Sequence, residues 1–504
     1  MKLKALFAAA LLASALLAPA TVFAQEETLR IDYIFSGTDK TAEISVDELC
    51  RLEGWAGRRT RLKEVPLRGN GQICMTSAAS GDTLYRTSFS TLFQEWQATE
   101  EAVSVRKSFE NVFLLPMPSE PVNISVELYD FKGNTAASLT HPVDPGDILI
   151  RPAGGFNPSD VADLVEGNEK GKYVHFSGSP AEKIDVAIVA EGYTAEEMDL
   201  FYADAQAAVE SIFNHDPFGA LRDRFNFLAV RSVSEDSGVS VPREGVWKKT
   251  AVGSNFDTFY SDRYLTTLRL RQLHDVLADV PYEHIIILAN TDTYGGGGIY
   301  NSYTLTTAHH PLFKPVVVHE FGHSFGALAD EYYYDDQFVE YYYPGVEPWE
   351  KNITTLADFG SKWLGLLPAG AVVTAEGRIT DSEGSVLNPE DFGISTGSAS
   401  SKRAARRTLR AAGASREDSS SPSSLGGRQA GTVGQETAEG TSGLDSGRGA
   451  GQGDAAWLFE GGGYQSKGVW RGAEDCRMKT NEAAGFCPVC QHAIEDIIRF
   501  YTED

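Results

Sequence analysis

Apolar and polar residues alternate through much of the first third of the chain. Residues 29–34 read LRIDYI and residues 122–129 read VNISVELY, so that an apolar side chain recurs at every second position. This period of two is typical of strands that bury one face. The turn signal KGN at 132–134 follows the second strand, and a helical insert is an option near residues 91–105. We therefore predict an N-terminal β-sandwich over residues 25–150.

No residue pattern in this predicted sandwich carries catalytic chemistry, and we interpret it as a folding or positioning domain. The chain that follows is punctuated by proline and glycine, as in RPAGG at 151–155 and NP at 157–158. Such residues interrupt regular structure. We therefore predict a linker over residues 151–182.

Beyond the linker, apolar strands alternate with helices. Strands are predicted at residues 183–193, 225–233 and 284–290, and helices at residues 194–213, 264–277 and 491–501. Thr194, with Glu197 three residues later, suits the start of the first of these helices as a capping box. Mostly apolar strands between helices are typical of a sheet covered on both faces. The sequence therefore predicts an α/β catalytic domain over residues 183–504, within an α+β multidomain chain.

Residues 395–455 differ in kind from the rest of this domain. They include the run SSSPSS at 419–424 together with many glycine, alanine, arginine and threonine residues. Such a composition has too few apolar groups to form a core. We predict that this segment is a disordered insertion in the catalytic domain.

The negative net charge argues against nucleic acid as a partner. The 504 residues carry a formal charge of −26, and the sequence pI is about 4.8. Binding to nucleic acid requires a basic face that neutralises phosphates. We therefore expect no nucleic-acid partner.

The first 24 residues have the pattern of a secretory signal peptide. Lys2 and Lys4 precede the apolar run ALFAAALLASALLA, and small residues flank the end of the segment at Val22-Phe23-Ala24. No other stretch approaches the length of a membrane span. We expect an exported protein, periplasmic or extracellular, whose mature chain begins at Gln25.

Five cysteines suit an oxidising compartment. Cys50 and Cys74 are close enough in sequence to pair. Cys476, Cys487 and Cys490 cluster near the C-terminus, where the C-x-x-C pair could be half of a zinc knuckle but lacks a second pair. We favour a disulfide from Cys476 to one of the other two.

The strongest chemical signal is the run VVVHEFGHSFGALADEY at 316–332. It contains an H-E-x-x-H motif, formed by His319, Glu320 and His323. Residues four apart lie on one face of an α-helix, so both imidazoles can bind the same Zn²⁺ ion. Glu320 lies beside that face, where it can act as the general base on a metal-activated water.

A third protein ligand is needed to complete a catalytic zinc site. On a continuous helix, Asp330 would be roughly 10 Å along the axis from His323, too far to share the ion. The helix must therefore end, and Gly326 is the residue that can take a left-handed turn. The layout resembles the metzincin motif H-E-x-x-H-x-x-G-x-x-H, although Ala329 occupies the position of its last histidine. We predict Asp330 as the third ligand, with Glu331 as the alternative.

Other segments near the motif have weaker signals. The glycine run at 295–298 leads into an expected edge strand at 299–307, which either lines a substrate cleft or is an ordinary edge. A tyrosine of the groups at 332–334 and 341–343 could stabilise an oxyanion, although none can be singled out. Met478 lies among glycines and cysteines and would fill the place of the methionine beneath a metzincin metal.

Several motifs together resemble the secreted IgA-peptidase-type zinc metallopeptidases and their N-terminal β domain. The resemblance is carried by residues 318–332 (VHEFGHSFGALADEY), 352–355 (NITT), 458–464 (LFEGGGY), 476–478 (CRM), 486–490 (FCPVC), 91–96 (TLFQEW) and 108–113 (SFENVF). It covers nearly all of the mature chain except the predicted insertion. It implies a metallopeptidase whose founding activity is hydrolysis of immunoglobulin A near its hinge.

The sequence thus predicts a secreted zinc-dependent endopeptidase with a metzincin-like catalytic domain. Its substrate would be a protein or peptide, with immunoglobulin among the candidates. Two alternatives stay open: an exported surface-binding protein with a structural or vestigial zinc site, and a zinc amidase that acts on cell-wall peptide. The intact Glu320 disfavours the first, because a purely structural site does not need a base.

Overall fold

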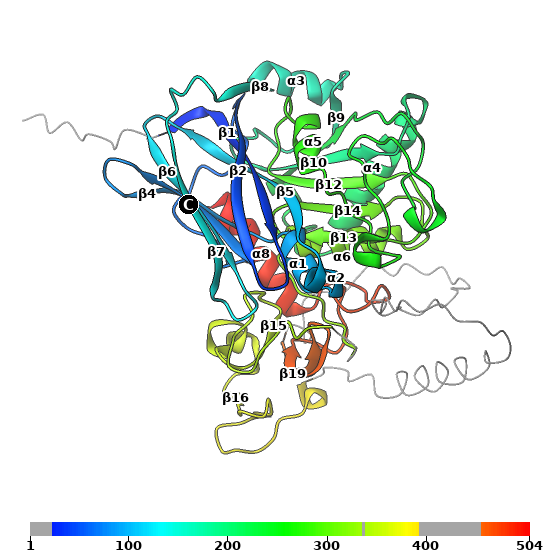
Figure 1. Ribbon diagram of the computed structural model, residues 1–504. Helices are drawn as coiled ribbons and strands as arrows, with labels where there is room; N and C mark the ends of the chain where they lie inside the picture. Colours follow the sequence, from blue (N-terminus) through cyan, green and yellow to red (C-terminus); the bar gives the residue numbers. More distant parts are fainter. Residues whose placement is uncertain (1–22, 335–337, 393–454, 504) are drawn as a thin grey trace, which may run out of the picture.

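The computed structural model describes residues 23–334, 338–392 and 455–503 (Figure 1). The predicted signal peptide lies outside these residues except for its last two, which begin strand β1. The predicted insertion also lies outside them, apart from its final residue.

Two four-stranded sheets form the N-terminal part of the chain, which confirms the predicted N-terminal strand domain. One sheet has the order β5-β1-β2-β8 and the other the order β4-β3-β6-β7. The strands are β1 (Phe23–Gly37), β2 (Ala42–Glu53), β3 (Gly71–Ser77), β4 (Thr83–Phe89), β5 (Lys107–Pro118), β6 (Val122–Tyr129), β7 (Thr135–Val143) and β8 (Arg151–Gly155). Two short helices, α1 (Leu92–Gln97) and α2 (Glu100–Ser104), fill the place of the expected helical insert.

The alternating pattern produces this sandwich directly. On β6, the residues at every second position from Val122 to Leu128 are buried, and their neighbours are only partly so. On β1, Leu29, Ile31 and Tyr33 are fully buried in the same core. Strands that bury one face in this way stabilise each other only when two sheets pack together.

A six-stranded sheet with the order β13-β14-β12-β10-β11-β9 forms the centre of the second half. The four inner strands are parallel, and the two outer strands are antiparallel to their neighbours. The strands are β9 (Gly171–His175), β10 (Ile184–Glu191), β11 (Phe225–Val230), β12 (His284–Ala289), β13 (Gly296–Ile299) and β14 (Tyr303–Thr307). Every residue of β10, β11 and β12 is buried, as their apolar sequences predict.

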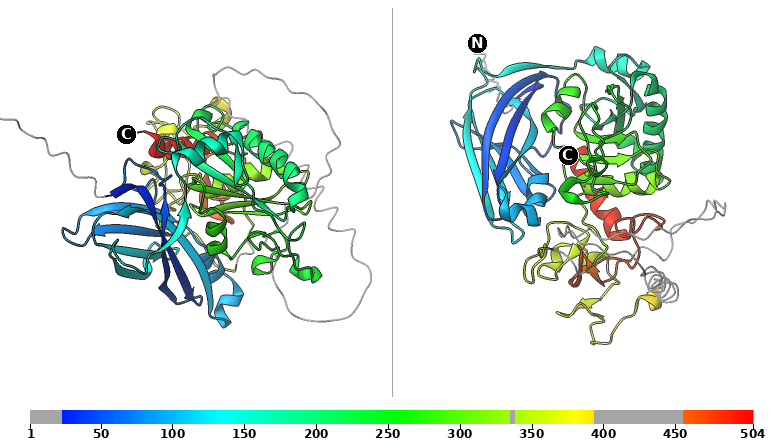
Figure 2. Two further views of the ribbon diagram at one scale, coloured as in Figure 1. Left: turned by 90° about the horizontal axis from the view of Figure 1, so that it is seen from above. Right: turned by 45° about the vertical axis from the view of Figure 1, so that its right-hand side comes forward.

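Three helices cover one face of this sheet, namely α4 (Met198–Phe213), α6 (Phe313–Ser324) and α8 (Pro488–Thr502). They share a hydrophobic core with Val186 and Ile188 of the sheet. The other face belongs to a second core that continues into the N-terminal sandwich, with α5 (Leu270–Val276) between them. The views of Figure 2 show the sandwich packed beside the α/β half.

A smaller region of short strands completes the fold and lies below the two larger halves in Figure 1. It contains a three-stranded sheet and a two-stranded sheet. The strands are β15 (Ile353–Thr354), β18 (Phe459–Gly462) and β19 (Gln465–Arg471) in the first, and β16 (Val372–Val373) and β17 (Ile379–Thr380) in the second.

The segment 151–182, predicted as a linker, instead contains regular structure. Strand β8 extends the sandwich, helix α3 (Pro158–Glu166) follows, and β9 joins the edge of the six-stranded sheet. The proline and glycine residues that suggested a linker lie at an edge strand and at the start of α3, where both residue types are tolerated.

The helix predicted over 264–277 forms only from Leu270. Before it, the Thr267 hydroxyl donates to the carbonyl of Val252 at 2.6 Å, and the Thr267 N–H donates to the hydroxyl of Tyr303 at 3.2 Å. These contacts to distant segments replace the helical hydrogen bonds, which explains why the local sequence pattern was misleading.

Candidate metal centre

Helix α6 presents the H-E-x-x-H motif at the edge of the six-stranded sheet. Its other side is anchored in the core by Val317, Val318 and Phe321, which are fully buried. His319, Glu320 and His323 are only partly buried on the opposite side. The apolar face of the helix therefore holds the motif residues toward a cleft.

Three ligand-type atoms meet at one point. The Nε2 atoms of His319 and His323 are 3.1 Å apart, and each is 3.1 Å from Oδ1 of Asp330. Three ligands of a tetrahedral zinc ion with bonds of about 2 Å must be roughly 3.3 Å from one another. The three side chains thus have the chemistry and spacing that such an ion requires.

Backbone carbonyls determine which nitrogen of each histidine faces this point. Nδ1 of His319 lies 2.9 Å from the carbonyl of Arg477, and Nδ1 of His323 lies 2.6 Å from that of Leu328. Because a carbonyl can only accept, each Nδ1 carries the hydrogen and each Nε2 of a neutral ring keeps its lone pair free. Both rings are therefore oriented to bind a metal through Nε2.

The chain turns back after α6, as the sequence predicts, but at a different residue. Ala327, and not Gly326, has the positive φ of 52°. The N–H of Ala327 donates to the carbonyl of His323 at 3.1 Å, which is the bond of an αL cap, and the N–H of Leu328 donates to the carbonyl of Gly322 at 3.1 Å. Gly326 is needed for space, since a Cβ there would lie 2.7 Å from the carbonyl oxygen of Gly322.

Two residues hold Asp330 in place after the turn. The hydroxyl of Tyr464 donates to Oδ2 of Asp330, which leaves Oδ1 for the histidines. The side chain of the buried Asn352 accepts from the N–H of Ala329 at 2.8 Å and donates to its carbonyl at 2.9 Å. Neither residue was identified as part of the site from sequence, where only the resemblance drew attention to their segments.

Glu331, the alternative third ligand, points elsewhere. Its carboxylate lies against the cysteines at the start of α8 and accepts from Asn352 at 3.1 Å. The structure therefore brings Asp330, and not Glu331, to the two histidines.

The electrostatics of the site favour an ionised carboxylate. Burial alone would raise the pKa of Asp330, but the adjacent imidazoles hold it far below its usual value. Burial opposes protonation of His323, whereas the same carboxylate outweighs this effect and raises its pKa to about 9. Asp330 thus stays ionised, and a bound cation would take the place of the proton that His323 holds.

Glu320 faces the glycine strand β13. Ideal Cβ atoms at Gly296 and Gly298 would lie 3.0 Å from Oε1 of Glu320 and 2.2 Å from its backbone oxygen. The glycines therefore allow α6 and β13 to approach each other closely. This glycine run forms the edge strand of the six-stranded sheet, whereas the sequence pattern predicted the edge strand at residues 299–307. Its outer side carries a short bridge with Tyr264.

Met478 lies beneath the motif helix. It is fully buried, and its Sδ would be 2.7 Å from a Cβ at Gly322. It occupies a tight turn in which the N–H of Lys479 donates to the carbonyl of Cys476 at 2.8 Å. The carbonyl of Met478 accepts from the N–H of Glu331, so this turn also supports the loop that carries Asp330.

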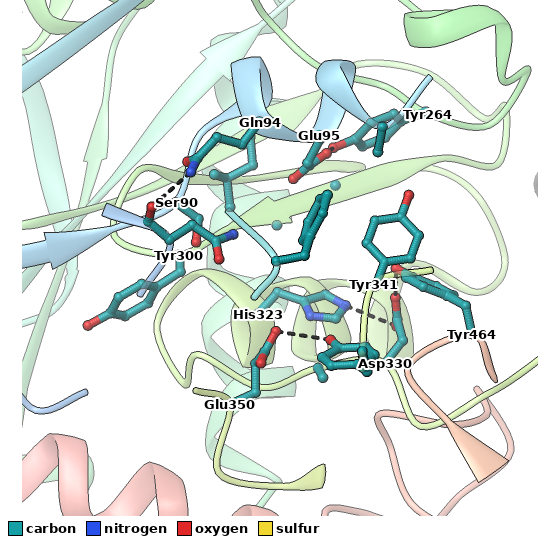
Figure 3. Close-up of a pocket in the computed structure, with 18 of the residues that line it drawn as sticks. Ser90, Gln94, Glu95, Tyr264, Tyr300, His323, Asp330, Tyr341, Glu350 and Tyr464 are labelled. Atoms are coloured by element: carbon teal, nitrogen blue, oxygen red, sulfur yellow. Dashed lines mark hydrogen bonds and ion pairs between the residues drawn. The ribbon is translucent and has the colours of Figure 1, made fainter. Parts of the chain in front are cut away.

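The cluster of His319, His323 and Asp330 lies in a cleft of about 1320 Å³ with walls from both halves of the chain. In Figure 3, Glu95 from helix α1 lies across from His323 and Asp330 and accepts from the hydroxyl of Tyr264. Burial raises the pKa of Glu95 to about 7. The N-terminal sandwich, interpreted from sequence as a folding or positioning domain, therefore lines the candidate site.

Two protein-family models match the chain. The family described as IgA Peptidase M64 matches residues 173–376 and 442–498. The chain belongs to this family. Its companion, described as Peptidase M64 N-terminus, matches residues 21–140. No curated protein matches the chain.

Membership of the M64 family supports a peptidase, and hence a hydrolase whose substrate is a protein. Over the described residues, no helix has the length and hydropathy needed to cross a membrane. The expected disulfides are not formed, since the cysteines at 50, 74, 476, 487 and 490 are all free thiols.

Proposed function

We propose that this M64 peptidase is a zinc-dependent endopeptidase of the metzincin type that is exported from the cell. The observation that carries the proposal is the triangle of 3.1 Å distances between His319, His323 and Asp330. These residues would hold the zinc ion. Glu320, the next residue on the same helix, would be the general base.

A bound zinc ion would polarise the scissile carbonyl and acidify the attacking water. Glu320 takes the proton from that water and returns it to the leaving amine. Burial raises the pKa of Glu320 above its usual value. A base with a raised pKa holds a proton more readily between the two transfers.

The shape of the cleft supports an extended peptide as substrate. Strand β13 forms one wall beside Glu320, and the N-terminal sandwich forms another through Glu95 and Gln94. Main-chain groups at a sheet edge can pair with an extended chain. The family description names immunoglobulin A, which makes this antibody a suitable substrate to test beside a general one such as casein.

Replacement of the base tests the mechanism. Glu320→Gln keeps the shape of the side chain but cannot take up the proton, so we expect kcat for casein to fall by about 100- to 10,000-fold while zinc stays bound. Zinc content is measured by plasma mass spectrometry. Casein cleavage is measured with and without a chelator. Glu196→Gln, an exposed carboxylate outside the cleft, is the matched control. Full activity of the zinc-loaded Glu320→Gln protein would contradict the proposal.

A further inference from the structure

A second cluster of metal-ligating side chains lies next to the first. It consists of Glu331, Cys476, Cys487 and Cys490, whose ligand atoms all lie within 4.8 Å of one another. All four residues are buried. Glu331 directly follows Asp330, whereas the cysteines come from the methionine turn and from the N-terminal end of α8.

The distances in this cluster fit a tetrahedral ion. The Sγ atoms of Cys476 and Cys490 are 3.6 Å apart, and Oε1 of Glu331 lies 3.1 Å from Sγ of Cys490 and 3.8 Å from Sγ of Cys487. Zinc bonds of about 2.3 Å to sulfur and about 2 Å to oxygen would place two thiolates roughly 3.8 Å apart and a thiolate and an oxygen roughly 3.5 Å apart. A disulfide would instead need sulfurs roughly 2.05 Å apart.

The polar groups around the cluster are consistent with negatively charged ligands. Oε2 of Glu331 is buried without a hydrogen-bond partner among the described residues, an arrangement that costs free energy unless something else binds it. The N–H of Cys487 donates to Sγ of Cys476 at 3.2 Å.

We propose that Cys476, Cys487, Cys490 and Glu331 form a second metal site, which binds a structural zinc ion. Three thiolates with a carboxylate suit zinc in a closed tetrahedral site. The three thiols release their protons when the ion binds. Cys476 and Glu331 would thus complete the site to which the C-x-x-C pair contributes two ligands.

This second site would tie three distant segments to the first. Glu331 adjoins Asp330, Cys476 adjoins the methionine turn under α6, and the C-x-x-C pair begins α8. A bound ion would therefore fix the loop that offers Asp330. The proposal does not depend on the peptidase mechanism, because metal binding is measured separately at each site.

The test is the zinc content of the purified full chain together with the absorption spectrum of its cobalt-substituted form. We expect about two equivalents of zinc and a thiolate-to-cobalt charge-transfer band. His323→Ala should lose about one equivalent and keep the band. Cys490→Ser should abolish the band and lose the other equivalent, whereas Cys50→Ser, a buried cysteine of the sandwich, should change neither.

Glu331→Gln covers the case in which Cys490→Ser does not fold, because it keeps all three thiols and nearly the same shape. We expect it to release its thiolate-bound zinc to a competing chelator about 10- to 100-fold more readily than wild type. Two results would overturn the proposal. One is a wild-type chain with a single zinc that His323→Ala removes, and the other is a disulfide between two of the three cysteines in the non-reduced protein.

Discussion

The surroundings of individual side chains decide which of two adjacent carboxylates faces the histidines. Asp330 and Glu331 have the same charge and are neighbours in sequence. Tyr464 binds one oxygen of Asp330 and leaves the other within 3.1 Å of both imidazoles. Glu331 is turned toward the cysteines instead. The position of Asp330 beside the histidines therefore depends on Tyr464, which orients its carboxylate.

Loss of the Tyr464 hydroxyl should weaken the first metal site. In Tyr464→Phe, Oδ2 of Asp330 loses its donor while the ring is kept, so we expect zinc affinity there to fall by about 10- to 100-fold. Competition with a chromophoric chelator measures this affinity. Tyr202→Phe on helix α4, away from the cleft, is the control. Unchanged affinity in Tyr464→Phe would show that this hydrogen bond does not position the ligand.

Asp185 should make stability depend on pH. Burial raises its pKa to about 8, and its Oδ2 has no partner among the described residues. An unfolded chain ionises this carboxyl near 3.9, so the folded state holds an extra proton between that pH and about 8. Stability therefore falls as pH rises through this window, by at most about 1.4 kcal/mol per pH unit.

Comparison with Asp185→Asn isolates this effect. The amide keeps the contact in which Asn226 donates to Oδ1 at 3.0 Å, but it does not titrate. Denaturant unfolding of both proteins from pH 5 to pH 8 should show the free energy of unfolding of wild type falling relative to that of the variant. A constant difference over this range would contradict the assignment.

The positions of helix α6 and strand β13 beside the cleft depend on the close contact between them. Strand β13 is rich in glycine because α6 leaves no room for a side chain, and a Cβ at Gly298 would also lie 2.8 Å from Cβ of His323. At the other end, the chain turns at Ala327, and the methionine turn holds the loop that follows through the N–H of Glu331. The motif residues are thus positioned by how closely neighbouring elements approach one another.

Gly298→Ala should disturb both stability and activity. The added methyl group would meet backbone atoms of α6, which cannot move away as a flexible side chain can. Overpacking of this kind destabilises a fold by about 1–3 kcal/mol, and here it would displace His323 and Glu320. Gly360→Ala, where a Cβ meets no atom within 4 Å, is the matched control. Thermal unfolding and casein cleavage measure the two effects, and a fully active and stable Gly298→Ala protein would contradict this account.

The two halves of the molecule form one continuous structure. A single hydrophobic core runs from the sandwich to one face of the six-stranded sheet. Arg30 of the sandwich is buried and pairs with Asp32 at 2.8 Å and, across the boundary, with Asp275 at 2.6 Å. We infer that the N-terminal half is both a support for the peptidase half and a wall of its cleft.

Removal of the charge on Arg30 should destabilise the whole molecule. Arg30→Ala leaves the buried Asp32 without its partner, which costs about 3–5 kcal/mol. Scanning calorimetry should show one lowered transition for both halves, because they share a core. Arg106→Ala, which breaks an exposed pair with Glu43, should cost at most about 1 kcal/mol. Two separate transitions, with only one lowered, would show that the halves unfold independently.

Local patterns were sufficient for the central strands of the second sheet and for part of the site. Alternation predicted β1 and β6 of the sandwich, apolar runs predicted β10 to β12, and the spacing of His319 and His323 placed them on one helical face. The family was recognisable from the same motifs. These features depend on near neighbours in sequence, whose relative positions the backbone geometry determines.

Contacts between distant residues decided the rest. Tyr464 orients Asp330 from 134 positions away, and Thr267 joins Val252 and Tyr303 instead of a helix. Glu95 reaches the cleft from the sandwich, and Cys476 joins Glu331 and the start of α8. No periodicity encodes such contacts, because they depend on how complete elements pack. The sequence by itself therefore determined the helix that carries His319, Glu320 and His323, and only the tertiary structure decided which residues complete and enclose the candidate site.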